Sequence, residues 1–341
     1  MPLLSPRLPE RFTIAIFGAQ FHGDSPSEAK SALIDDFEGA LEKSAVSVEN
    51  LWQDDTERGL GLSRVWVSYW KSPSDYEAWW KSAEVSRFWS TLPDDSGFWR
   101  ETLHFSSSRF VTETSQDIPN GVGHLGPLEQ VTEKTGYWGS LRDRIKESTA
   151  TDKLPSPLAS IPPPRAPDGS IRRGRVKMTT FPNNISFVTE GQDHNLMKDD
   201  ELQVWSAKFH WATKRFVTNV PSTVQDDPDI FPQLEVNRTV ELLYLLDFRY
   251  MERLGRSDKA HLALRQNFMD DYGPDGVLAK GDMCVWADCG VLRAEDMLAE
   301  YIGCYEGTGF LAYDHHPEFK STTTSSSNGA WSRVTSFLGL S

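Results

Sequence analysis

The sequence predicts an α+β protein, and two observations carry this prediction. Apolar strands rich in β-branched and aromatic residues are followed directly by amphipathic helices, and this strand-helix unit recurs along the chain of 341 residues. The content of apolar residues is 38% and that of charged residues 25%, which is typical of a globular protein with a sizeable core.

The first unit is the strand "FTIAIFGAQF", residues 12–21, and the helix that follows it. Ser25 is expected as the N-cap, Pro26 as the first helical residue and Glu28 as the partner in a capping box. Apolar residues then recur at helical spacing from residue 29 to residue 41, which predicts one buried helix face.

The same pattern returns at residues 64–89 and, more faintly, at residues 240–268. In the second unit Ser72 and Pro73 repeat the cap of the first, and in the third unit Ser257 opens a helix. The repetition indicates an internal duplication. We therefore expect two ferredoxin-like halves, of the dimeric α/β-barrel kind, that share an antiparallel sheet flanked by helices.

The composition shifts mark the boundaries between these halves. A segment rich in proline and arginine, residues 151–175, is expected to be a loop without regular structure. It separates an N-terminal half, residues 1–150, from a C-terminal half, residues 176–320. The serine- and threonine-rich residues from 321 onward are expected to form a tail, residues 321–341.

Charge and cysteine usage exclude several classes of partner. A formal charge of −14 repels nucleic acid and anionic membranes, so neither is an expected partner. The N-terminus lacks the pattern of a secretory signal and no window is long and apolar enough to span a membrane, which favours a cytoplasmic location. The three cysteines form no CxxC unit and are expected to be reduced structural thiols.

The tract "GYWGSLRDRI", residues 136–145, resembles a signature of the haem-containing aldoxime dehydratases. Two further tracts similar to that family follow in the same order, "NISFVTEGQD" at 184–193 and "AEYIGCYEGTGFL" at 299–311. The resemblance covers about Phe17 to Leu311. It implies haem b as cofactor, in a pocket between the halves, and the dehydration of an aldoxime to a nitrile.

The resemblance nominates His261 as the proximal ligand of the haem iron. His261, Leu264 and Phe268 also share one face of the expected helix, so the histidine lies in an apolar stripe, with Phe268 placed against the haem. The alternative is a core histidine. Arg144 matches the arginine that the family places on the distal side, where its fixed donors can orient an oxime hydroxyl but hardly donate a proton.

Two departures from the family alter the expected distal side. Ala287 occupies the place of the family's distal histidine, which is the acid that protonates the departing hydroxyl, and so would border the haem without a proton to give. Glu190 replaces the distal serine before Gly191. A buried Glu190 would have a raised pKa and could be the substitute acid, whereas an ion pair with Arg144 would leave it an anion. His194 and Asp288 are further candidates.

Three functions follow from these residues. The first is a haem b lyase that converts an aldoxime into a nitrile, with Arg144 and Glu190 as catalytic residues. The second is a haem enzyme on the same scaffold that carries out rearrangement or N–N bond formation on another N–O substrate. The third is a non-catalytic haem-binding protein. The expected partner is a small molecule with an N–O group, and the sheet could also support a homodimer.

Overall fold

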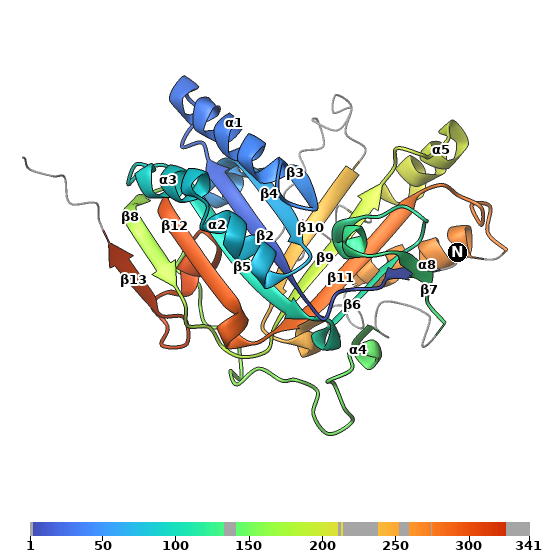
Figure 1. Cartoon of the computed structure of the whole chain (residues 1–341). Coiled ribbons are helices and arrows are strands. Elements are labelled where there is room, and N and C mark those ends of the chain that lie inside the picture. The colour runs from blue at the N-terminus through green and yellow to red at the C-terminus, as the bar shows by residue number, and fades with distance from the viewer. Residues whose placement is uncertain are drawn as a thin grey trace, which may run out of the picture.

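The computed structural model describes residues 3–132, 141–210, 213, 238–251, 259–273 and 275–324. Two antiparallel sheets form its centre (Figure 1). The α+β prediction is confirmed. No helix of the described part is long and apolar enough to cross a membrane.

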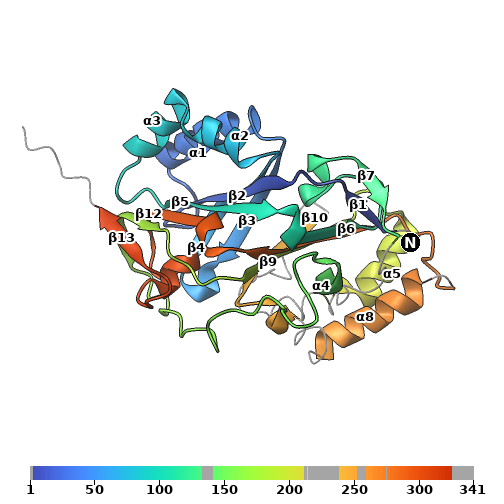
Figure 2. The same ribbon diagram turned by 60° about the horizontal axis from the view of Figure 1, so that its bottom comes forward.

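Sheet B has the strand order β13-β8-β12-β5-β2-β4-β3. Its strands are β2 (Arg11–Gln20), β3 (Ser47–Asp55), β4 (Gly61–Trp70), β5 (Phe98–Ser106), β8 (Ile171–Met178), β12 (Met297–Tyr305) and β13 (Ser321–Thr324). The order β5-β2-β4-β3 within it is that of a ferredoxin-like unit, as the first two sequence repeats predict. The helices α1 (Glu28–Glu42), α2 (Pro73–Trp80) and α3 (Ala83–Thr91) cover one face of this unit (Figure 2).

Sheet A has the strand order β10-β9-β11-β6-β1-β7. Its strands are β1 (Leu4–Pro6), β6 (Phe110–Thr114), β7 (Leu128–Gln130), β9 (Ile185–Asp193), β10 (Arg238–Leu245) and β11 (Cys284–Leu292). Because β6 comes from the first 150 residues and pairs with β11, the two halves of the chain share this sheet, as predicted. The helices α4 (Leu141–Arg144), α5 (Asp199–Lys208) and α8 (Lys259–Tyr272) lie on the side away from α1, α2 and α3 (Figure 2).

The chain passes between the sheets at sharp bends. The strand pair β5 and β6 is interrupted by the short helix η2 (Ser107–Arg109), and the pair β11 and β12 by η6 (Ala294–Asp296). Each pair therefore contributes one strand to each sheet. The inner faces of the two sheets enclose a large apolar core, to which β2 contributes Phe12, Ile14 and Ile16, each at most 2% exposed.

Three local predictions need correction. The N-cap of α1 is Ser27, whose side chain accepts a hydrogen bond from the Lys30 amide, and not Ser25. β8 begins at Ile171, inside the range expected to be a loop, because it pairs with β12 along its length. The expected tail likewise begins with β13, which pairs with β8.

Two other local predictions are confirmed, and one lies outside the described part. Ser72 caps α2 with Pro73 in the first turn. The three cysteines are free and buried. Ser257 lies outside the described residues, as do residues 136–140 of the tract 136–145.

Candidate active site

Three glutamates and Ala287, which the resemblance sets in the place of a distal histidine, form one row across sheet A. Glu241 of β10 pairs with Glu190 of β9, Glu190 pairs with Ala287 of β11, and Ala287 pairs with Glu113 of β6. Side chains of directly paired residues point to the same face, with Cβ atoms about 5 Å apart. Ala287 thus has a carboxyl-bearing neighbour on each side. The row lies on the face of sheet A turned away from sheet B, called here the outer face.

Glu190 has a buried carboxyl group, although the residue as a whole is partly exposed. Burial raises its pKa to about 7, because the charged form loses its hydration. No arginine contributes to this shift. Near neutral pH, a substantial share of Glu190 therefore carries a proton.

Arg144 ends α4 and reaches the same face. Its Nη2 lies 2.9 Å from Oε2 of Glu113 and donates to the Thr112 carbonyl at 3.4 Å. Arg144 therefore forms its ion pair with Glu113 and not with Glu190, which was the alternative that the sequence left undecided. The Nε atom of Arg144 is buried and has no hydrogen-bond partner among the described residues. A bound molecule on this face could accept from it.

Glu113 is a site residue that the sequence analysis missed. It is 2% exposed, and burial raises its pKa to about 7 although Arg144 opposes this shift. The signal was present in the strand "FVTET", where a glutamate alternates with Val111 on one face. A buried glutamate needs a partner, and that partner comes from a distant segment.

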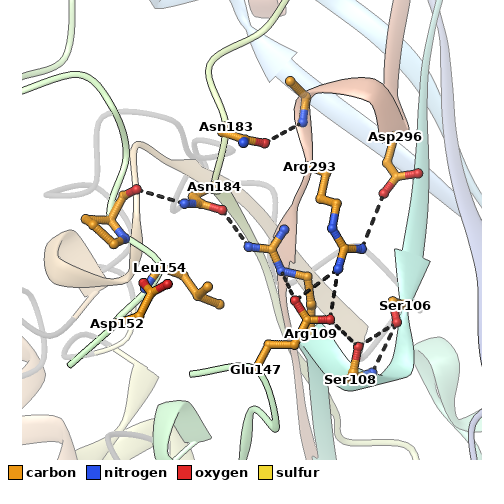
Figure 3. A network of polar contacts seen from close by, with 12 residues as sticks. Ser106, Ser108, Arg109, Glu147, Asp152, Leu154, Asn183, Asn184, Arg293 and Asp296 are labelled. Carbon is orange, nitrogen blue, oxygen red and sulfur yellow. Dashed lines mark hydrogen bonds and ion pairs between the residues drawn. The ribbon is translucent and has the colours of Figure 1, made fainter. Parts of the chain in front are cut away.

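Glu147 anchors the segment that carries Arg144. Its carboxylate accepts from Nη2 of Arg293 at 2.8 and 2.9 Å and from the Ser108 hydroxyl at 2.6 Å, and it lies 3.3 Å from Nε of Arg109 (Figure 3). Arg109 also donates to the Asn184 side chain at 2.5 Å. The bends between the two sheets therefore hold the chain three residues beyond Arg144.

His261 lies on α8, which covers part of the same outer face. His261, Leu264 and Phe268 belong to the less exposed stripe of the helix. Phe268 stacks on Tyr272 with ring centroids 4.8 Å apart and meets the edge of Phe209 at 6.3 Å. The predicted iron ligand is therefore set in an apolar stripe on a helix, on the side of sheet A to which Glu190 and Ala287 point. Glu190, Ala287 and Arg144 thus share this outer face, and α8 with His261 lies on the same side of sheet A (Figure 2).

The two further candidates for a proton donor lie apart from this row. Asp288 follows Ala287 and points to the opposite face, where it accepts from the Thr112 hydroxyl at 2.7 Å. Burial raises its pKa to about 7 as well. His194 follows β9, contacts Gln192 at 3.3 Å and packs on Trp205, and burial lowers its pKa to about 4. A histidine of that pKa is neutral at pH 7 and is a poor acid.

The fold and the outer face define a class of protein. A ferredoxin-like unit in sheet B is joined to sheet A, whose outer face carries buried titratable groups, and the helix α8 carries a histidine on the same side. Such an arrangement suits an apolar planar cofactor between helix and sheet, with a polar distal side.

The chain belongs to the family described as haem-containing dehydratases, whose model matches residues 15–310. It is 25% identical to phenylacetaldoxime dehydratase of Bacillus sp. (strain OxB-1) over 73% of each chain. It is 28% identical to an aliphatic aldoxime dehydratase of Rhodococcus globerulus, over 72% of this chain and 70% of that one. A crystal structure of aldoxime dehydratase has the same fold, with a TM-score of 0.71, 20% identity and 91% of each chain covered. The family's cofactor is haem, as the sequence predicts.

The residues of the outer face fit a haem group. The His261 imidazole supplies a nitrogen ligand of the type that binds haem iron, and Leu264 and Phe268 supply apolar surface beside it. The buried Nε of Arg144 is a donor that the described residues leave unused. Ala287 places only a methyl group on this face.

Proposed function

We propose that this protein is a haem-dependent lyase that removes water from an aldoxime to give a nitrile, with Glu190 as the acid in place of the family's histidine. His261 would hold the haem, which when bound would supply an iron centre for a nitrogen ligand such as that of an oxime. The remaining work falls to residues of the chain. They must orient the hydroxyl and protonate it so that it leaves as water, and they must accept the proton that the oxime carbon loses as the nitrile forms. The carboxylate that Glu190 becomes after giving its proton is the proposed acceptor.

Arg144 is the orienting group in this proposal. A guanidinium stays charged at any pH relevant here and presents donors in a fixed plane, so Nε can donate to the oxime oxygen without giving up its proton. Glu113 holds Nη2 of the same guanidinium at 2.9 Å and so limits its rotation. Glu113 is in this sense a positioning residue.

Glu190 is the proton donor in this proposal. The hydroxyl must leave as water, and a general acid in hydrogen-bond reach is worth about two to four orders of magnitude in rate. The observation that carries the assignment is the pairing of Arg144 with Glu113, since it leaves Glu190 with a pKa of about 7 and no cationic partner among the causes of its shift. An acid works best when its pKa lies near the operating pH.

The test is to incubate the reduced, haem-loaded protein with an aromatic and with an aliphatic aldoxime. Chromatography measures the rate at which the nitrile forms. Glu190→Gln should lower the rate by about 10²- to 10⁴-fold, the value of a general acid. Asp288→Asn is the matched control, because Asp288 has a similar pKa but faces away from the site. An unchanged rate for Glu190→Gln would refute the acid assignment.

A double variant at positions 190 and 287 provides a second experiment. Glu190→Ser combined with Ala287→His returns both positions to the residues that the family carries, and this variant should recover activity that Glu190→Ser alone loses. Binding of the oxime without nitrile in every variant would instead support a different reaction on the N–O group.

A further inference from the structure

A buried carboxylate of α5 joins the helix that carries His261 to the strand that carries the distal row. Glu201 lies in the first turn of α5 and is 4% exposed. Its Oε1 accepts from the Tyr272 hydroxyl and from the Met283 amide, each at 3.0 Å, and its Oε2 accepts from the Asp282 amide at 2.8 Å. These three hydrogen bonds, called here the Glu201 clamp, hold the last residue of α8 and the two residues before β11.

The loop before β11 is shaped to admit this carboxylate. A side chain on Gly281 would come within 2.5 Å of Oε1 of Glu201 and within 2.7 Å of the Tyr272 ring, so only glycine permits the close approach. The Gln116 side chain holds the loop from its other side, where it donates to the carbonyl groups of Gly281 and Met283 at 3.2 and 3.3 Å. The loop, the carboxylate and the tyrosine therefore meet in a fixed arrangement.

A second polar contact joins the same two helices at the other end of α5. The ammonium group of Lys208, the last residue of α5, donates to both carboxylate oxygens of Asp271 at 2.8 and 2.9 Å. Asp271 directly precedes Tyr272 at the end of α8. The C-terminal end of α8 is thus held from both ends of α5, and the two helices lie side by side (Figure 2).

The less exposed stripe of α8 runs from the clamp to the predicted iron ligand. The Tyr272 ring stacks on Phe268, and Leu264 and His261 follow on the same side of the helix at intervals of four and three residues. Backbone hydrogen bonds hold a helix of 14 residues as one piece. A displacement of Tyr272 would therefore also displace His261.

The other end of the connection lies on β11. Val285 packs against the same cluster of buried residues as Leu264 and Phe268. Ala287 lies two residues further along the strand and so points to the same, outer face. The amides that bond Glu201 belong to the residues directly before this strand. The clamp therefore links the position of α8 to that of the distal row.

We propose that Glu201 is a positioning residue, which sets the place of His261 relative to the distal residues by holding the Tyr272 hydroxyl. This inference rests on the ligand assignment within the proposed function, and it does not require that the product be a nitrile. A helix that merely completes the core would need the ring of Tyr272 but not its hydroxyl. Removal of that one oxygen therefore separates positioning from packing.

Tyr272→Phe is the test, in the full-length, haem-loaded protein. The variant keeps the ring beside Phe268 and leaves the two backbone hydrogen bonds of Glu201 in place. Tyr76→Phe is the matched control, because Tyr76 is also buried and its hydroxyl lies 2.9 Å from the Thr102 hydroxyl and accepts from Arg100 at 3.0 Å. Both variants lose contacts of one buried hydroxyl, so thermal unfolding should show similar losses of stability.

Two measurements on the haem distinguish the variants. Transfer of haem to an excess of a haem-free globin gives the rate of haem loss, and resonance Raman spectra of the reduced protein give the iron–histidine stretch. We expect Tyr272→Phe to lose haem about tenfold faster, the value of one hydrogen bond to a carboxylate, and to shift this band. Tyr76→Phe should change neither. Unchanged values in Tyr272→Phe, or equal changes in both variants, would overturn the proposal.

Glu201→Gln adds a second variant that does not alter the aromatic packing. Its amide group places N–H donors against a backbone amide, so this variant should also lose haem faster. Because the two residues act through one contact, Glu201→Gln combined with Tyr272→Phe should lose haem no faster than the more affected single variant. Fully additive effects would show that the two residues act separately.

His261→Ala separates this inference from the ligand assignment. Loss of haem from His261→Ala, beside a Tyr272→Phe protein that behaves like the unaltered one, would refute the positioning role and leave the ligand in place. Full retention of haem by His261→Ala would refute both.

Discussion

The guanidinium of Arg144 lies 2.9 Å from the carboxylate of Glu113, and this pair joins α4 to the central strands of sheet A. Both groups are nearly buried, with side chains 11% and 2% exposed. A pair of this kind is costly to break, because removal of one partner leaves the other charged and buried. The arginine is thereby kept away from Glu190, two strands further along the sheet.

Glu113→Gln tests this arrangement. The amide keeps the shape of the side chain but removes the charge that holds Arg144, so the arginine gains freedom to turn toward Glu190. We expect kcat for nitrile formation to fall by about tenfold or more, because Arg144 would then lower the pKa of Glu190. The pH at which activity is half-maximal should move downward with it. A loss of rate without any movement of the pH profile would argue for a purely structural role.

The pH dependence of activity tests Glu190. Its pKa is raised to about 7, so the protonated form that an acid needs is present below that pH and is lost as the pH rises through it. We expect nitrile formation to decline above about pH 7. Glu190→Gln should remove this alkaline limb from the profile of kcat. An identical limb in the variant would assign it to another group.

Glu147→Ala tests the anchor of the Arg144 segment. Removing the carboxylate leaves Arg109 and Arg293 without their shared partner at the bends between the sheets (Figure 3). We expect a higher KM for the aldoxime and a lower kcat, with haem still bound, since Glu147 acts only through the position of Arg144. Arg173→Ala is the control, because its pair with Asp95 is exposed and worth little. Glu147→Gln should recover part of the loss by keeping the Ser108 contact.

His261→Ala tests the iron ligand. Without the imidazole the haem has no protein ligand in the proposed site, and we expect the variant to lose haem during gel filtration. Leu262→Ala is the control, since Leu262 is the next residue on α8 and is 39% exposed. The ratio of haem absorbance to protein absorbance measures the result. A fully loaded His261→Ala protein with an unchanged spectrum would exclude the assignment.

The sequence predicts the repeated strand-helix units because hydrophobic periodicity and caps such as Ser72 are local signals. Glu113 escaped notice because its importance depends on Arg144, 31 positions away, and on the register that places it beside Ala287. Whether Glu190 is a proton donor or the partner of an ion pair also depended on the contact between Arg144 and Glu113. The first residues of β8 could not be found from their composition, since the partner strand β12 and not local propensity makes them a strand.

The stability of the fold should fall as the pH rises from about 4 to 7, and Asp288 provides the test. Its pKa in the folded protein is about 7 against an ordinary value of 3.8, so the folded state retains a proton that the unfolded state has released in this range. The free energy of unfolding then decreases with pH, by up to about 4 kcal/mol for a shift of this size. Asp288→Asn removes the titration, and its amide can still bond the Thr112 hydroxyl and the Val122 amide. The free energy of unfolding of the variant minus that of the unaltered protein should be larger at pH 8 than at pH 5. Urea unfolding of both proteins at both pH values measures this difference. Glu129→Gln, at an exposed position, is the control, and an equal difference at both pH values would show that Asp288 is ionised in the fold.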